Sequence, residues 1–377
     1  MKGKGLDICP APVAANSAPP AFYTSSVRNI TSALRNRRSS GGSGEPNWIE
    51  ELHSKIVGQS EGLGAVIPYV QMYQAGLSPE GRPAGVFLLL GPTGTGKTRT
   101  VEALAEVLHG SQKNVLRIDC GEFQLDHEVA KLIGAPPGYL GHRETQPMLT
   151  QMKLNAVASE KLNLSIVLFD EIEKAAGSMT RLMLGVLDKG ALRLGDNTSV
   201  NFDRSLIFMT SNLGAKEMAR QLNPDFGFET LLTERASASR VSAKKLESVC
   251  MAAVKRKFSP EFINRIDVFA TYSPLTRSSL ELILEQQLTA LQDHLDRRLL
   301  DRSFTLTVPK ESREFLLNKG TSHEYGAREL KRVIHRFVIQ PLAALVSQGM
   351  IESDADVSQD VDVGNQKLLV RSGLKAA

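Results

Sequence analysis

Cysteine is scarce in this chain of 377 residues, with only Cys9, Cys120 and Cys250 scattered along it. Their odd number and the lack of any Cys-x-x-Cys spacing exclude a disulfide framework and a cysteine-held metal cluster, which fits a reducing cytoplasm. The seven histidines show no His-Glu-x-x-His motif, and no apolar run is long enough to cross a bilayer. A formal net charge of +4 is too small, in so long a chain, to indicate nucleic acid by itself. We therefore expect a cytoplasmic protein without a membrane or nucleic-acid partner.

The composition divides the chain into three regions. Residues 1–46 are rich in proline, alanine, serine and glycine and cannot bury enough apolar surface to fold, so we expect a flexible tail. Residues 47–273 alternate short apolar runs with helical patterns, which is typical of an α/β domain with a mostly parallel, five-stranded sheet. Residues 274–377 have mainly helical patterns, and runs at residues 304–308 and 367–370 indicate a small additional sheet. The five strands expected in the larger domain are Val86–Leu90, Val115–Ile118, Ile166–Phe169, Leu206–Met209 and Val268–Tyr272.

A glycine-rich loop joins the first of these strands to a predicted helix over residues 99–109. Its glycines let successive backbone N–H groups point inward at a phosphate, and the following helix directs its positive end to the same place. Lys97 adds a full positive charge, and the Thr98 hydroxyl can coordinate Mg²⁺. This pattern of a phosphate-binding loop (P-loop) predicts a nucleoside triphosphate site. The predicted contacts are Gly91, Pro92, Thr93, Gly94, Thr95, Gly96, Lys97 and Thr98.

Polar residues follow two other predicted strands. Asp170 and Glu171 come directly after the apolar run that ends at Phe169, and Asn212 follows the run that ends at Met209. The carboxyl ends of parallel strands meet at one edge of a sheet, where such sheets bind ligands. We expect Asp170 to hold Mg²⁺, Glu171 to activate the attacking water, and Asn212 to position that water or contact the γ-phosphate.

Five segments together resemble the Clp family of AAA+ unfoldases, and in particular the C-terminal ATPase ring of its two-ring members. They are Gly91–Thr98, Asp170–Lys174, Thr210–Gly214, Pro260–Asp267 and Tyr325–Arg328, in the order found in that family. The resemblance implies an α/β P-loop large domain followed by a small helical domain. It further implies that ATP is hydrolysed with Mg²⁺, that copies assemble into a single hexameric ring, and that the ring acts on polypeptide substrates.

The resemblance also assigns roles that spacing alone does not show. Ile56 and Val57 match a segment that packs on adenine, Arg265 matches an arginine that reaches the ATP of the adjacent subunit, and Arg328 matches a second nucleotide sensor. A guanidinium is always charged and presents a planar fork that suits phosphate oxygens.

Without the resemblance, a local role for both arginines is the simpler interpretation. Arg265 would then pair with Asp267, and Arg328 with Glu324 or Glu329.

Tyr139 and Leu140 lie between Gly138 and Gly141, a pattern that indicates an exposed loop. It resembles the pore loop of the Clp family, in which an aromatic ring grips extended polypeptide. The alternatives are a remodelling ATPase that acts on one partner complex without threading it, and the regulatory subunit of a Clp-type protease. Phe226 is an imperfect match to the peptidase-docking tripeptide of protease-partnered members, so a peptidase or adaptor partner is left open.

Overall fold

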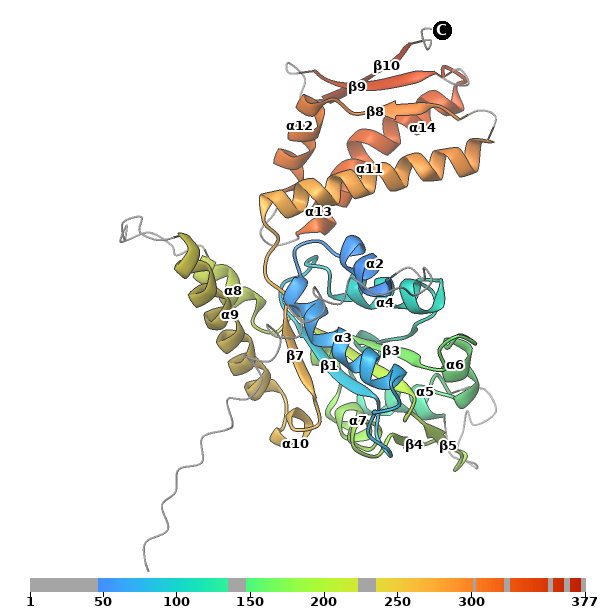
Figure 1. Cartoon of the computed structure of the whole chain (residues 1–377), viewed down its shortest axis with the longest axis vertical. Helices are drawn as coiled ribbons and strands as arrows, with labels where there is room; N and C mark the ends of the chain where they lie inside the picture. Colours follow the sequence, from blue (N-terminus) through green and yellow to red (C-terminus); the bar gives the residue numbers. More distant parts are fainter. Residues whose placement is uncertain are drawn as a thin grey trace, which may run out of the picture. The chain divides into compact units, whose positions relative to one another are not determined.

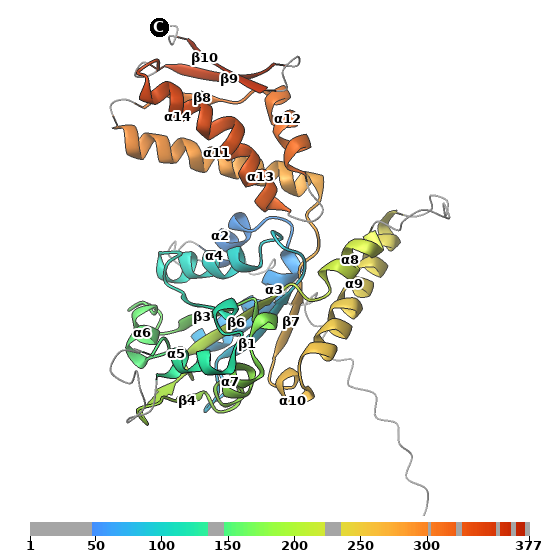
Figure 2. The same cartoon turned by 180° about the vertical axis from the view of Figure 1, so that it is seen from behind.

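A computed structural model describes residues 47–134, 147–222, 235–300, 303–321, 326–351, 355–362 and 367–373. The larger part is built on a five-stranded sheet in the order β2-β3-β6-β1-β7, and every neighbouring pair of strands is parallel (Figures 1 and 2). This confirms the predicted α/β class. The strands are β1 (Gly85–Leu90), β2 (Leu116–Asp119), β3 (Ser165–Asp170), β6 (Ser205–Ser211) and β7 (Val268–Thr271).

Helices cover both faces of this sheet, as buried central strands require. Strands β1, β3 and β6 are buried along their whole length, which explains their continuous apolar runs. On one face lie α2 (Trp48–Lys55), α3 (Ser60–Gln74) and α4 (Lys97–His109). On the other face lie α5 (Val129–Ile133), α6 (Gln151–Ala156), α7 (Gly177–Lys189), α8 (Ala215–Leu222), α9 (Arg235–Lys257) and α10 (Pro260–Ile263).

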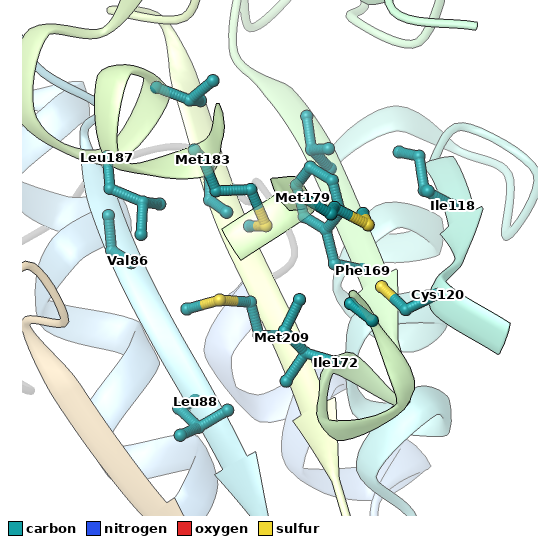
Figure 3. Close-up of a cluster of buried hydrophobic side chains, with 14 of the residues drawn as sticks. Val86, Leu88, Ile118, Cys120, Phe169, Ile172, Met179, Met183, Leu187 and Met209 are labelled. Carbon is teal, nitrogen blue, oxygen red and sulfur yellow. The ribbon is translucent and has the colours of Figure 1, made fainter. Parts of the chain in front are cut away.

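The hydrophobic core on the face covered by α5–α10 packs α7 against the sheet through methionine, leucine and phenylalanine side chains (Figure 3). Met179, Met183 and Leu187 recur at helical spacing on α7 and meet Phe169 and Met209 from β3 and β6. Each of these side chains is buried, and burial of one such side chain stabilises the fold by roughly 1.5–3 kcal/mol.

The described residues of the larger part also form three short 3₁₀ turns and one hairpin. The turns are Cys120–Glu122, Asp126–Glu128 and Ile172–Lys174. The hairpin pairs β4 (Ala191–Arg193) with β5 (Ser199–Asn201) in antiparallel register, and the sequence interpretation did not include it. Its strands alternate exposed and buried residues over only three positions each, which is too short for the pattern to be recognised.

The C-terminal part combines helices with a three-stranded sheet, in agreement with the predicted small helical domain. The helices are α11 (Arg277–Leu299), α12 (Lys310–Gly320), α13 (Ala327–Ile334), a π turn at His335–Ile339 and α14 (Gln340–Ser347). The sheet has the order β10-β9-β8 and consists of β8 (Thr305–Thr307), β9 (Asp356–Asp362) and β10 (Lys367–Gly373). The sequence predicted β8 and β10 but not β9, because the residues of β9 are mostly acidic or polar and lack the apolar pattern of a strand. Leu280, Leu284, Leu316, Leu330 and Val338 form the centre of its core.

Candidate nucleotide site

The loop between β1 and α4 has the backbone that a phosphate cradle needs. Gly91 has a φ of 142°, and a Cβ atom there would lie 2.4 Å from the carbonyl oxygen of Tyr272, so no other residue fits. Gly96 caps α4 with a φ of 105°, and a Cβ atom there would meet nothing within 4 Å. The inner side of the loop therefore opens onto free space at the positive end of a helix, where an anion is stabilised.

Lys97 is buried inside this loop. Its ammonium group donates hydrogen bonds to the carbonyl oxygens of Gly91 (2.7 Å) and Pro92 (2.8 Å) and to Oδ1 of Asn212 (3.0 Å). Burial lowers the pKa of Lys97 to about 8, while the carboxylate of Glu173 opposes that shift. Lys97 is thus charged at neutral pH, but its protonation state is sensitive to mildly alkaline conditions.

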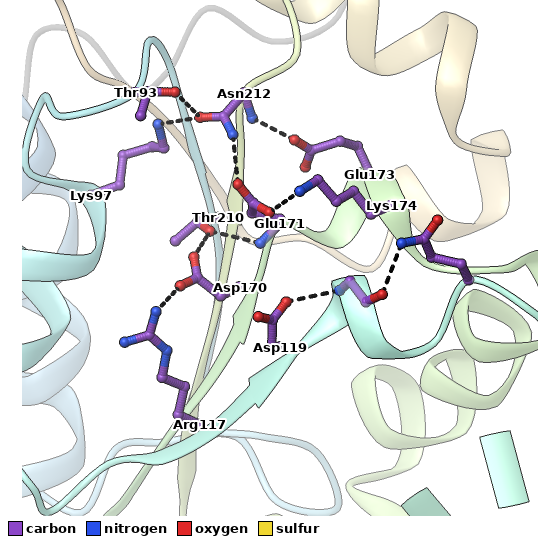
Figure 4. A network of polar contacts seen from close by, with 12 residues as sticks. Thr93, Lys97, Arg117, Asp119, Asp170, Glu171, Glu173, Lys174, Thr210 and Asn212 are labelled. Carbon is purple, nitrogen blue, oxygen red and sulfur yellow. Dashed lines mark hydrogen bonds and ion pairs between the residues drawn. The ribbon is translucent and has the colours of Figure 1, made fainter. Parts of the chain in front are cut away.

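The two acids at the end of β3 are tied to β6 by the hydroxyl of Thr210 (Figure 4). This hydroxyl donates to Oδ1 of Asp170 and accepts a hydrogen bond of 3.0 Å from the backbone N–H of Glu171. Glu171 has a φ of 56°, in the left-handed region that costs a non-glycine residue roughly 1–2 kcal/mol. Such a conformation persists only where its surroundings enforce it, and here Thr210 holds the backbone.

Asn212 connects the end of β6 to both glutamates. Its side-chain amide donates to Oε1 of Glu171 over 3.3 Å, and its backbone N–H donates to Oε1 of Glu173 over 3.0 Å. Lys174 forms an ion pair with the other carboxylate oxygen of Glu171. The structure therefore brings Lys97, Glu171 and Asn212, which come from three separate motifs, into one network.

The turn before α13 lies directly against the P-loop. The backbone N–H of Ala327 donates to the carbonyl oxygen of Gly94 over 3.1 Å. Gly326 has a φ of 49°, and a Cβ atom there would lie 2.9 Å from the same oxygen. This contact places Arg328 at the pocket in front of the P-loop. Burial is the main cause of the lowered pKa of Lys97, and the positive charge of Arg328 lowers it further.

A pocket of about 330 Å³ collects most of the predicted site residues. Those that line it are Ile56, Val57, Thr93, Gly94, Thr95, Gly96, Lys97, Thr98, Asp170, Glu171, Asn212 and Arg328. Gly91 and Pro92 lie behind it, where their carbonyl oxygens hold Lys97. Tyr139, Leu140 and Phe226 lie outside the residues that the structure describes.

Sequence reasoning missed several residues that support this pocket. Gln59 is buried and donates from its side-chain amide to the carbonyl oxygens of Thr95 (3.1 Å) and Ser273 (2.9 Å), which fixes the loop from outside. Thr210, Glu173 and Arg117 were also not assigned a role. Gln59 ends the segment Ile56–Gln59 that resembles the adenine-packing segment, but its burial and its two carbonyl partners follow only from the fold.

Among the described residues, Arg265 forms no ion pair with Asp267 and Arg328 forms none with Glu329. Arg265 pairs with Asp188 at the end of α7, with 2.7 Å between Nη1 and Oδ1, whereas Asp267 pairs with Arg82 over 2.6 Å. Asp267 is drawn away because its other oxygen accepts the backbone N–H of Val86.

Of the two acids considered as partners of Arg328, the structure describes only Glu329. Glu329 pairs with Arg332 over 3.1 Å, one helical turn along α13, whereas Arg328 lines the pocket. Glu324 lies outside the described residues.

The donor set fits ATP with Mg²⁺. The glycine cradle at Gly96 is open, a lysine lies within it, and Thr98 and Asp170 line the same pocket. In the part of the chain that the structure describes, no group of three or more His, Cys, Asp or Glu could hold a metal ion by itself. Thr98 and Asp170 offer two oxygen ligands, and Mg²⁺ commonly takes one or two protein oxygens and obtains the rest from phosphates and water. Fold and site thus define a P-loop ATPase.

Comparison with known proteins gives the family. The model of the AAA domain (Cdc48 subfamily) matches residues 82–269, and that of the C-terminal, D2-small domain of ClpB protein matches residues 275–358. The chaperone protein ClpB of Meiothermus ruber is 37% identical over 306 residues, which are 81% of this chain and 33% of that protein. The chaperone protein ClpB of Pseudomonas putida is 40% identical over 300 residues, 80% of this chain and 32% of that protein.

Solved structures agree. A closed-state structure of Hsp104 with ATPγS and FITC-casein has a TM-score of 0.71 at 27% identity, and covers 86% of this chain and 51% of that chain. An extended conformation of the Saccharomyces cerevisiae Hsp104–casein complex has a TM-score of 0.72 at the same identity, with 88% and 53% covered. The chain therefore belongs to the AAA ATPases, in the Clp branch, and it spans about a third of the length of these two ClpB proteins.

Proposed function

We propose that this chain hydrolyses ATP with Mg²⁺ and that a ring of its copies uses the energy to unfold or remodel polypeptides. The observation that carries the proposal is the meeting of Lys97, Glu171 and Asn212 at one sheet edge, with Arg328 reaching the same pocket. We further propose domain limits of 47–273 for the ATPase domain and 274–377 for the small domain, with residues 1–46 as a separate tail. The two family matches fall within these limits.

The proposed roles follow from the contacts at each side chain. The backbone of Gly94 to Gly96 and the ammonium of Lys97 bind the phosphates, and Ile56 and Val57 contact the base. Glu171 accepts a proton from the attacking water, because Lys174 and Asn212 hold its carboxylate in place at the pocket. Thr98 and Asp170 would hold Mg²⁺, which neutralises phosphate charge when it is bound.

Arg328 would report the state of the nucleotide to the small domain. The turn that carries it contacts the P-loop through the backbone of Ala327 and Gly94. A shift of the loop would therefore be transmitted to α13, because the turn is hydrogen-bonded to Gly94 and packs too closely on it to admit a side chain at Gly326.

The polypeptide substrate is inferred from the relatives. The relatives found by sequence are named chaperone proteins, and both Hsp104 structures are described with casein. A ring is inferred from Arg265, which lies outside the chain's own pocket, with a side chain that is 39% exposed, and its number of six subunits is what the resemblance to the Clp family implies. A site completed by a neighbour's arginine requires a head-to-tail interface that closes into a ring. No helix among the described residues is long and apolar enough to cross a membrane.

The Glu171→Gln variant tests this function. The substitution keeps the side chain's size and its hydrogen bond to Asn212 but removes the base, so ATP should bind with unchanged affinity and be hydrolysed at least a hundredfold more slowly. Affinity is measured with a fluorescent ATP analogue and turnover by release of phosphate. A variant that retains full turnover would remove Glu171 from the mechanism.

A trapping experiment with the same variant tests the substrate class. Held with ATP, the variant should retain unfolded casein through size-exclusion chromatography, whereas the same protein with ADP should release it. Equal retention in both states would refute ATP-driven action on polypeptides.

A further inference from the structure

Arg117 occupies a position beside the proposed metal site that the mechanism above does not use. It lies on β2, where the parallel register places it opposite Leu168 and therefore diagonal to Asp170 on the same face of the sheet. Its Nη2 atom forms an ion pair with Oδ2 of Asp170, as Figure 4 shows. Arg117 also lines the nucleotide pocket together with Thr98.

Both carboxylate oxygens of Asp170 are engaged by protein groups. Oδ1 accepts from Thr210, and Oδ2 is paired with Arg117. Thr210 is 2% exposed and also holds the backbone of Glu171, so it cannot turn away without releasing that residue. The side chain of Arg117 is 53% exposed and free to swing into solvent. A cation that binds Oδ2 of Asp170 therefore competes with Arg117 for that oxygen.

A second acid is placed to receive the displaced arginine. Glu102 lies on α4, one helical turn beyond Thr98, and its Oε1 is 4.0 Å from Nη1 of Arg117. Its side chain is 34% exposed, so the arginine can move toward it without being buried further. The guanidinium thus has two acceptors, one of which is a proposed metal ligand.

We propose that Arg117 competes with the divalent cation for Asp170 and passes to Glu102 when the cation binds, so that it sets the metal affinity of the nucleotide site. Arg117 is a positioning residue in this account, since it acts through Asp170. The inference rests on the proposed function, because it assumes that Asp170 holds the metal.

The experiment measures binding of Mn²⁺ to the full chain saturated with ADP, by the loss of the free-ion electron paramagnetic resonance signal. Replacing Arg117 by glutamine should tighten Mn²⁺ binding about fivefold, the factor that corresponds to roughly 1 kcal/mol for a partly exposed ion pair. Arg117→Lys, which keeps the charge, should remain close to the unmodified protein. Binding of ADP in the presence of a chelator checks that each variant is folded.

Arg99→Gln is the matched control for charge. Arg99 lines the same pocket and is 39% exposed, but its acid partner is Glu106 at 3.7 Å. If loss of any positive charge tightened Mn²⁺ binding, this variant would match Arg117→Gln, and that result would overturn the proposal. An unchanged or weaker affinity in Arg117→Gln would overturn it as well.

Glu102→Gln tests the second acceptor. The substitution Glu102→Gln is made in the unmodified chain and in the Arg117→Gln variant. It should weaken Mn²⁺ binding by a factor about twofold larger in the unmodified chain, because only that chain has an Arg117 side chain that can move to Glu102. Equal effects in both backgrounds would show that Glu102 acts by its charge alone and would refute the transfer. Failure of the unmodified chain to bind ADP would instead contradict the proposed function, so the two failures are distinguishable.

Discussion

Replacing Thr210 with valine removes one hydroxyl and leaves the shape of the side chain almost unchanged. The hydroxyl donates to Asp170 and accepts from the backbone of Glu171, and the residue is buried. A hydrogen bond to a charged group contributes about 1.5–3 kcal/mol, and a buried N–H left without a partner costs about 1–3 kcal/mol. We expect the variant to lose about 3 kcal/mol in the free energy of unfolding. Glu171 also loses the contact that holds its left-handed backbone, so turnover should fall with it.

Thr271→Val provides the matched control. Thr271 lies on β7, and its buried hydroxyl has no hydrogen-bond partner among the described residues. Its removal should change the free energy of unfolding by less than about 0.5 kcal/mol and leave turnover intact. Urea unfolding followed by circular dichroism gives the stabilities, and phosphate release gives the rates. If the two variants agreed within about 0.5 kcal/mol and hydrolysed ATP equally well, the role given to Thr210 would be wrong.

Three further outcomes are expected. Arg265→Ala should leave ADP affinity unchanged and lower assembled turnover at least a hundredfold, and an unaltered rate would contradict action on a neighbour. The control Arg256→Ala, which removes an exposed partner of Glu217, should change neither ADP affinity nor turnover. Tyr139→Ala should abolish unfolding of a tagged substrate with hydrolysis intact, and retained unfolding would favour remodelling without threading. Metal-free ADP affinity should decline as the pH rises through 8, because Lys97 loses the proton that its phosphate contact needs; a flat titration from pH 7 to 9.5 would contradict a low pKa for Lys97.

The centre of the main sheet could be predicted because strands β1, β3 and β6 are buried on both faces. Runs such as Val86–Leu90 and Leu206–Met209 are apolar at every position, and their polar ends mark the edge where ligands bind. The short β4–β5 hairpin and the acidic strand β9 could not be found in this way. Their residues are mostly polar, and pairing with a neighbouring strand defines them more than local pattern does.

The residues of the site also divide into those that a local pattern indicates and those that only the fold brings together. Lys97, Asp170 and Asn212 are recognisable because each follows a strand at a fixed place in a motif. Arg117 becomes a partner of Asp170 only through the register in which β2 pairs with β3. That register could not be predicted from the sequence alone. The pairing of Arg265 with Asp188 likewise joins residues far apart in the chain. Their proximity follows from the packing of α7 and α10, which no local pattern contains.

The most direct test of the account is the rate of phosphate release from ATP and Mg²⁺ by the full chain, measured over a range of protein concentrations beside its mass in solution. We predict that turnover per chain rises as a ring assembles and disappears in Lys97→Ala. A chain that stays monomeric and releases no phosphate at any concentration would contradict the account.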